Sequence, residues 1–77
     1  MANKKSKPLF QRIKDFESLQ PFAHEVIAFN DHYHLRITAS NGDIIDYFPV
    51  SEKYRKKGAT FFLNGLSNLI DYLNEVS

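Results

Sequence analysis

The dipeptide Asn41–Gly42 constrains the fold of this chain more than any other local feature. Asn-Gly is the strongest short-range signal for a two-residue hairpin turn, because both turn positions need a positive φ. Alternating apolar and polar residues flank it on both sides, in HYHLRITAS (32–40) and DIIDYFP (43–49). The sequence therefore predicts two antiparallel strands joined at this turn, with Arg36 facing Tyr47.

Four further segments complete the predicted fold. FAHEVIAF (22–29) is β-branched and aromatic, which favours a strand that enters the hairpin through a tight turn at Asn30–Asp31. Residues 8–20 have apolar side chains at helical spacing and end before Pro21, and residues 64–76 form a second amphipathic pattern. ATFFL (59–63) is expected to add a short fourth strand. The predicted class is α+β, a three- to four-stranded antiparallel meander with an N-terminal and a C-terminal helix.

The two-residue turn also assigns the faces of the sheet, because side chains alternate along a strand. The predicted core face holds His24, Val26, Ala28, Tyr33, Leu35, Ile37, Ala39, Ile44, Asp46 and Phe48. Leu69 and Leu73 of the second helix are expected to pack on Leu35, Ile37 and Phe48. Asp46 conflicts with this assignment, since an unpaired carboxylate in a core is costly. We expect the third strand to lie at an edge, where Asp46 reaches solvent.

The composition fits one small domain. The 77 residues contain no cysteine, which excludes a disulfide framework and thiolate metal sites. We expect a flexible basic arm over residues 1–7 and a single domain over residues 8–77. The first ten residues lack a hydrophobic run, and no apolar stretch approaches the roughly 20 residues of a membrane helix. We therefore expect a cytoplasmic protein, and nothing in the sequence indicates a cofactor.

The charges are unevenly distributed along the chain. Five of the ten basic residues lie in residues 1–14 and four in residues 53–57, with Arg36 the tenth. Seven of the nine acidic residues lie in residues 15–52. A net charge of +1 is low for a protein dedicated to duplex nucleic acid. Two local basic patches remain compatible with nucleic-acid binding.

A protein-binding surface is the first functional hypothesis. Aromatic residues and arginine are enriched at protein interfaces, whereas lysine is depleted there. The predicted outer face groups such side chains around Arg36. The candidate partner-binding residues are Tyr47, Arg36, His34, Ile27 and Ile45. The expected function is a non-enzymatic binding domain for a protein partner, with a second copy of the chain as an alternative partner.

Nucleic-acid binding is the alternative hypothesis. The segment after the third predicted strand combines four cations with a tyrosine, and such a run can contact phosphates and stack on bases. The candidate residues are Lys53, Tyr54, Arg55, Lys56 and Lys57, together with the basic arm. A charge run of this kind is more often a solvated turn. The acidic middle of the chain also opposes phosphate binding.

Catalysis and metal binding have little support in the sequence. His32 and His34 are two residues apart, a spacing at which imidazoles can share a metal ion, but no cysteine or second histidine pair completes a ligand set. No nucleophile stands beside a base in a recognisable constellation. We therefore expect neither an enzyme nor a metal site.

Residues 33–75 contain GDIIDYFPVSEKYRKKGATFFLNGLSNLIDYL, which resembles a pattern in short phage and prophage proteins of unassigned function. In that pattern a strand ends in an aromatic pair and a proline, and a later Gly-Leu opens the last helix. The resemblance implies a mobile-element origin and a domain that binds and blocks a host protein. The α-β-β-β-α order also resembles the double-stranded-RNA-binding-like fold, which includes small RNA-cleaving toxins with a histidine beside glycine. Here NDHYHLR lacks that glycine.

Overall fold

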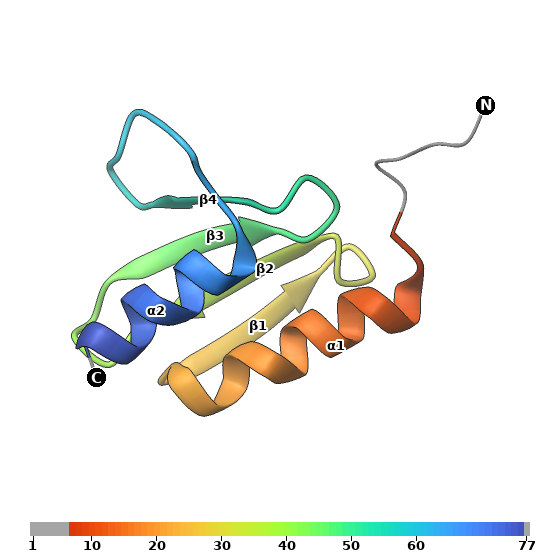
Figure 1. The fold of residues 1–77 in the computed structure, drawn as a ribbon, viewed down its shortest axis with the longest axis horizontal. Coiled ribbons are helices and arrows are strands. Elements are labelled where there is room, and N and C mark those ends of the chain that lie inside the picture. Colours follow the sequence, from red (N-terminus) through yellow and green to blue (C-terminus); the bar gives the residue numbers. More distant parts are fainter. Residues whose placement is uncertain (1–6, 77) are drawn as a thin grey trace.

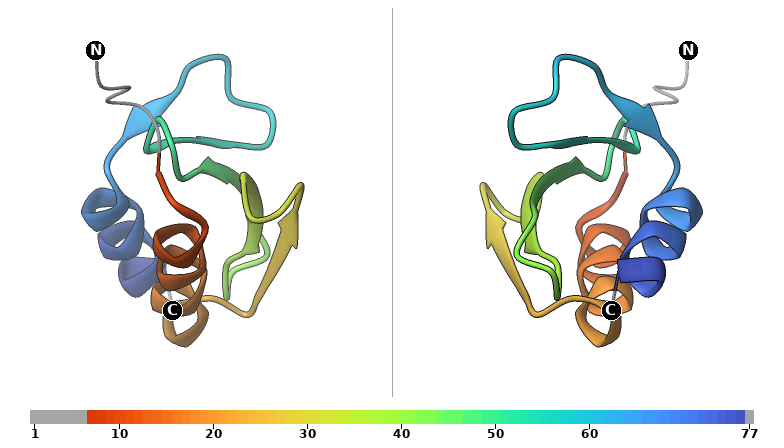
Figure 2. Two further views of the ribbon diagram at one scale, coloured as in Figure 1. Left: turned by 90° about the vertical axis from the view of Figure 1, so that its right-hand side faces the viewer. Right: turned by 90° about the vertical axis from the view of Figure 1, so that its left-hand side faces the viewer.

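The computed structural model describes residues 7–76 as an antiparallel meander with both helices packed on one face of the sheet (Figures 1 and 2). The strands are hydrogen-bonded in the order β1-β2-β3-β4-β5. The elements are α1 (Leu9–Leu19), the 3-10 helix η1 (Gln20–Phe22), β1 (Glu25–Phe29), β2 (His34–Thr38), β3 (Ile44–Phe48), β4 (Lys53–Lys56), β5 (Leu63–Asn64) and α2 (Leu66–Val76). This confirms the predicted α+β class with its two flanking helices. No helix in this part of the chain has the length and apolarity to span a membrane.

The basic segment forms a strand that the sequence analysis did not predict. β4 pairs antiparallel with β3 on one side and with β5 on the other. The prediction of a solvated turn over Lys53–Lys57 is therefore wrong for its first four residues. The expected strand over 59–63 is reduced to its last residue, because β5 begins at Leu63. Cross-strand pairing, rather than local propensity, makes the lysine-rich segment extended.

The hairpin of β2 and β3 is closed by a pair between Ala39 and Asp43, so its loop has three residues, 40–42, instead of the predicted two. The Gly42 N–H donates to the Ala39 carbonyl at 2.9 Å, and the Ala39 N–H donates to the Asp43 carbonyl at 2.8 Å. Gly42 has a φ of 94°, the left-handed position that closes a three-residue hairpin loop. The extra loop residue shifts the pairing by one, so Arg36 faces Asp46 rather than Tyr47.

A one-residue shift exchanges the two faces of a strand. The predicted core positions of β3, namely Ile44, Asp46 and Phe48, therefore lie on the outer face, which is the sheet face away from the helices. Ile45 and Tyr47 point into the core instead, where they are 1% and 0% exposed. The prediction that Asp46 escapes to solvent from an edge strand is wrong, because β3 is central and Asp46 never faces the core.

The loop between β1 and β2 is longer still, but it preserves the predicted faces of both strands. Asn30, Asp31 and His32 all have positive φ, and Phe29 pairs with His34 across the resulting four-residue loop. This pairing differs from the predicted one by two residues, which restores the same alternation. Tyr33 lies within the loop and is 50% exposed, so its predicted core position is wrong.

The core between the sheet and the helices is formed by residues that are spread over the whole chain. Leu69 and Leu73 of α2 are fully buried with Leu35 and Ile37, as predicted. Phe48 does not take part, because it lies on the outer face. The buried hydrophobic set is Leu19, Leu35, Ile37, Ala39, Ile45, Tyr47, Tyr54, Leu69 and Leu73. His24 lies just before β1 and is exposed, which corrects its predicted core position.

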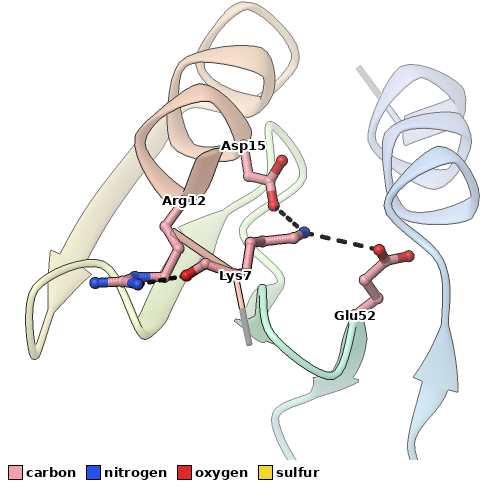
Figure 3. Close-up of polar contacts among 4 residues, drawn as sticks. All are labelled: Lys7, Arg12, Asp15 and Glu52. Atoms are coloured by element: carbon pink, nitrogen blue, oxygen red, sulfur yellow. Dashed lines mark hydrogen bonds and ion pairs between the residues drawn. The ribbon is translucent and has the colours of Figure 1, made fainter. Parts of the chain in front are cut away.

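A buried ion pair anchors the start of the described chain (Figure 3). The Lys7 ammonium lies 2.8 Å from the Asp15 carboxylate and 3.7 Å from that of Glu52, at the turn before β4. Arg12 donates to the Lys7 carbonyl at 2.6 Å. The Lys7 side chain is therefore held between α1 and the turn before β4, and residues 1–6 of the predicted arm lie outside the described residues. Burial, followed by the nearby Asp15 and Glu52 carboxylates, raises the pKa of Tyr47.

Replacing Gly42 by valine should lower the free energy of unfolding by about 1–3 kcal/mol, the cost of holding a β-branched residue at a positive φ. A Cβ at Gly42 meets no atom within 4 Å, so the loss would come from backbone strain and not from a clash. Urea denaturation of the variant measures it, and Ser40→Ala in the same exposed loop is the control. An unchanged midpoint for Gly42→Val would contradict the three-residue loop.

Truncating Leu69 to alanine should cost roughly 2–5 kcal/mol, because Leu69 is fully buried between α2 and the sheet. Glu75, on the same helix, is exposed and provides the control as Glu75→Ala. Thermal and urea melts of both variants give the comparison. A folded Leu69→Ala protein with wild-type stability would contradict the placement of α2.

Candidate functional site

The outer face carries a row of aromatic rings that runs across the strands. Phe29, His34 and Phe48 come from β1, β2 and β3, and Phe62 joins them from the loop before β5. Their centroids are separated by 5.4 Å, 4.8 Å and 6.2 Å in that order. We call these four residues the ring row. Cross-strand neighbours on one sheet face come this close only when the register aligns them.

The two central rings and the two terminal rings of the ring row differ in how much ring surface is free to contact a ligand. His34 and Phe48 stack on each other with planes 20° apart, so each uses one ring face on its neighbour. Phe29 and Phe62 stand at the two ends and remain 39% and 45% exposed. The two terminal rings are therefore the available apolar contacts.

A second row of charged side chains lies beside the ring row. Arg36 faces Asp46 across β2 and β3, and Asp46 faces Arg55 across β3 and β4. We call Arg36, Asp46 and Arg55 the charged row. The Arg36 guanidinium lies 5.7 Å from the centre of the Phe29 ring, and that of Arg55 lies 4.9 Å from the centre of the Phe62 ring. Each terminal ring is thus accompanied by a guanidinium group.

Asp46 links the two rows. Its Oδ1 atom lies 2.8 Å from His34 Nε2 and 3.3 Å from Arg36 Nε. Burial raises the pKa of Asp46, but the hydrogen bonds from His34 and Arg36 outweigh it, and the pKa lies below the ordinary value of 3.8. The carboxylate is therefore ionised at neutral pH and holds the imidazole and one guanidinium in place.

Two acidic residues of the middle segment are engaged away from the outer face. Asp15 is paired with Lys7 beneath α1, and Asp43 accepts from Tyr72 of α2 and lies 3.6 Å from Lys56. On the outer face, alternation along β4 places Lys53 and Arg55 beside the ring row. The uneven charge of the sequence thus becomes a face with more cations than anions.

Only part of the predicted docking surface lies on this face. Arg36, His34 and Ile27 are there, as predicted, and Ile27 is 40% exposed. Tyr47 and Ile45 are not, because the one-residue shift after Gly42 turns both into the core. Their prediction as partner-binding residues is wrong on this ground, since neither side chain can reach a partner.

The predicted basic cluster is divided between two faces. Lys53 and Arg55 lie on the outer face, whereas Tyr54 is 7% exposed on the core side and cannot stack on a base. Lys56 lies on the same side as Tyr54, 5.8 Å from the Tyr72 ring. Lys57 follows β4, and its N–H donates to the Ile44 carbonyl. Strand geometry thus separates residues that a turn would have kept together.

The candidate residues chosen from the sequence did not include Phe29, Phe48, Phe62 and Asp46. Two of these follow once the loop at Gly42 is given three residues, because Phe48 and Asp46 then join His34 on one face. Phe62 had no local signal, since it reaches the ring row from a loop. Its sequence neighbour Phe61 instead lines a cavity of about 240 Å³ on the core side, with Tyr54 and Tyr72.

The two histidines singled out in the sequence do not form a pair. His32 packs edge-on against Phe16 of α1 at 5.2 Å, whereas His34 belongs to the ring row. Within residues 7–76 no group of three or more His, Cys, Asp and Glu residues is placed to hold a metal ion.

Comparison with known proteins adds no relative. No protein-family model matches the chain, and no curated protein or solved structure matches it significantly. The arrangement of the outer face is therefore the basis for any functional assignment.

Stability should depend on Asp46 in a pH-specific way. Because its pKa is lowered by folding, the ionised carboxylate stabilises the protein above the unfolded value near 3.8, and this contribution is lost as the pH falls through the lower folded value. Asp46→Asn should therefore be less stable than wild type at neutral pH and approach it in acid. Urea melts across the acid range measure the difference. A stability difference between the two proteins that does not change with pH would contradict the contacts of the ionised Asp46 carboxylate with His34 and Arg36.

Proposed function

We propose that this protein is a non-enzymatic binding domain for single-stranded nucleic acid, which it binds on the outer face of the sheet. The observation that carries the proposal is the position of the ring row directly beside the charged row. Proteins that bind single strands combine aromatic side chains, on which bases stack, with cations that contact the backbone. Here both components occur on one face, and the two helices of the described chain lie on the other (Figure 2).

The two ends of the ring row support single-strand binding. Phe29 with Arg36 and Phe62 with Arg55 each join an exposed ring to a guanidinium within 6 Å. A base on the ring and a phosphate at the guanidinium would satisfy both groups of such a pair. Stacking on a ring requires a base that is free of its duplex partner, so single strands should bind better than duplexes.

The site differs from the one that the sequence suggested. Of the five predicted basic-segment residues, Lys53 and Arg55 lie on the proposed surface, and Tyr54 does not. The aromatic contribution comes from phenylalanines of other segments instead. This relocation weakens the main objection to nucleic-acid binding, because Asp15 and Asp43 of the acidic middle segment are engaged away from the outer face.

A protein partner is the second candidate for the same face. Ile27 and Phe29 of β1 are 40% and 39% exposed. Across the sheet, Arg36 lies between Ile27 and Asp46. Exposed apolar and arginine side chains of this kind are typical of interface centres. The partner-binding role predicted for Ile27, His34 and Arg36 therefore stays as the competing proposal, including a host protein as the phage-like pattern implies.

The adjacent phenylalanines provide a direct test. Phe62→Ala should weaken binding of a fluorescently labelled single strand about 5- to 150-fold, the range for losing one stacked base. Phe61→Ala is the matched control, because Phe61 is 61% exposed but lines the core-side cavity. The three cations Arg36, Lys53 and Arg55 should give a log–log salt slope of about −2 for a single strand. Fluorescence anisotropy measures both.

Two results would count against the proposal. Equal losses for the Phe61 and Phe62 variants would show that the site is elsewhere or that the binding is not specific to this face. No binding to single strands, combined with nuclease-resistant capture of a protein that Phe62→Ala or Ile27→Ser abolishes, would favour the protein partner instead.

A further inference from the structure

The centre of the outer face holds a carboxylate where a surface built only for phosphates would hold another cation. Asp46 lies between Arg36 and Arg55 in the charged row, two residues along β3 from the stacked ring of Phe48 on the same face. A negative charge there disfavours a phosphate at that point. It favours instead a group that donates hydrogen bonds.

The two oxygen atoms of Asp46 are used unequally. Oδ1 is within hydrogen-bond distance of both His34 Nε2 and Arg36 Nε, at 2.8 Å and 3.3 Å. Within residues 7–76, both hydrogen bonds of the Asp46 side chain end on Oδ1 and none ends on Oδ2. The side chain is 22% exposed, so it is held by its neighbours and still reaches solvent. An ionised carboxylate only accepts hydrogen bonds, so Oδ2 is an oriented acceptor at the centre of the face.

Nucleic-acid bases differ in whether they can satisfy such an acceptor. Cytosine and adenine carry an exocyclic amino group, as guanine does at N2, and a carboxylate accepting from cytosine N4 is an established mode of base recognition. Thymine and uracil present carbonyl oxygens at the corresponding positions, and their single N–H donor lies between two of them. A carboxylate therefore attracts the first pair of bases and repels the edges of the second.

We infer that Asp46 is a specificity-determining residue, through which the outer face prefers single strands whose bases carry an exocyclic amino group, cytosine and adenine over thymine and uracil. This inference rests on the proposed function. His34 and Arg36 act as positioning residues, since their contacts with Oδ1 hold the carboxylate with its second oxygen toward the ligand. The terminal rings and their guanidinium groups supply affinity without regard to sequence.

The test compares homopolymeric DNA strands of about ten residues, within the range of single-strand site sizes. The informative pair is oligocytosine against oligothymine, because both are pyrimidines, and oligoadenine is the third probe. Wild type should bind oligocytosine about tenfold more tightly than oligothymine at neutral pH, the effect of one base-edge contact. The readout is the ratio of the two dissociation constants, which removes the general effect of charge on affinity.

Matched variants separate base recognition from electrostatics. Asp46→Asn replaces an obligatory acceptor by a group that also donates, so the ratio should fall toward one. Glu25→Gln removes the same charge from the exposed start of β1 and should keep the wild-type ratio. Asp46→Ser provides a second substitution if the amide variant fails to fold, and thermal melts establish folding for each.

Each outcome has one consequence. A cytosine preference that is lost in Asp46→Asn and kept in Glu25→Gln supports the inference. Tight binding with equal constants for cytosine and thymine overturns the inference and leaves single-strand binding intact. A preference that survives both Asp46 substitutions also overturns it. Absence of binding to all three strands overturns the proposed function together with the inference.

Discussion

The single residue inserted into the loop between β2 and β3 determines what each side of this protein presents. Gly42 adopts a positive φ, which residues with a Cβ adopt only at a cost in free energy. The loop that Gly42 closes sets the register of β3 on β2. With this register Tyr47 and Ile45 complete the core, and Asp46 and Phe48 join the outer face. With a two-residue loop every one of these positions would be reversed, leaving a carboxylate in the core.

The outer face depends on this register for a second reason. Phe29, His34 and Phe48 come from three different strands, and they meet in one row only because both hairpins align them. The same holds for Arg36, Asp46 and Arg55 in the neighbouring row. Two rows on adjacent positions of the same face place rings and charges side by side, which no single segment of the sequence could do. The proposed binding surface is thus a product of strand pairing.

The parts of the fold that depend on local chemistry could be predicted from the sequence. The ends of both helices followed from Pro21 and from the apolar stripe that buries Leu69 and Leu73. The faces of β1 and β2 were also predicted, although their loop has four residues, because an error of two residues leaves the alternation unchanged. What failed depended on loop length or on distant pairing. Asn41–Gly42 fits both a two- and a three-residue loop, and β4 is a strand because β3 and β5 pair with it.

The candidate site was less predictable than the fold for the same physical reason. His34, Arg36 and Ile27 were placed on the correct face because β2 and β1 were. Tyr47 and Ile45 were misplaced by one residue of loop. Phe62 could not be found at all, since a ring that reaches a sheet from a loop leaves no periodic trace in the sequence. The sequence marked the basic segment as unusual. Only the alternation of side chains along β4 shows that Arg55 and Tyr54 lie on opposite faces of the sheet.

The placement of Leu69 and Leu73 has a consequence for how the chain is made. The meander forms from consecutive segments, but the core on its inner surface, with Leu35, Ile37 and Ile45, is completed only when α2 adds Leu69 and Leu73. Since α2 is the last element in chain order, this apolar layer is incomplete until residue 73 is available. The lysines and arginine of β4 emerge within this interval. Charges that flank a hydrophobic strand oppose association between chains, so the charges of β4 would disfavour contacts between chains whose core is still incomplete.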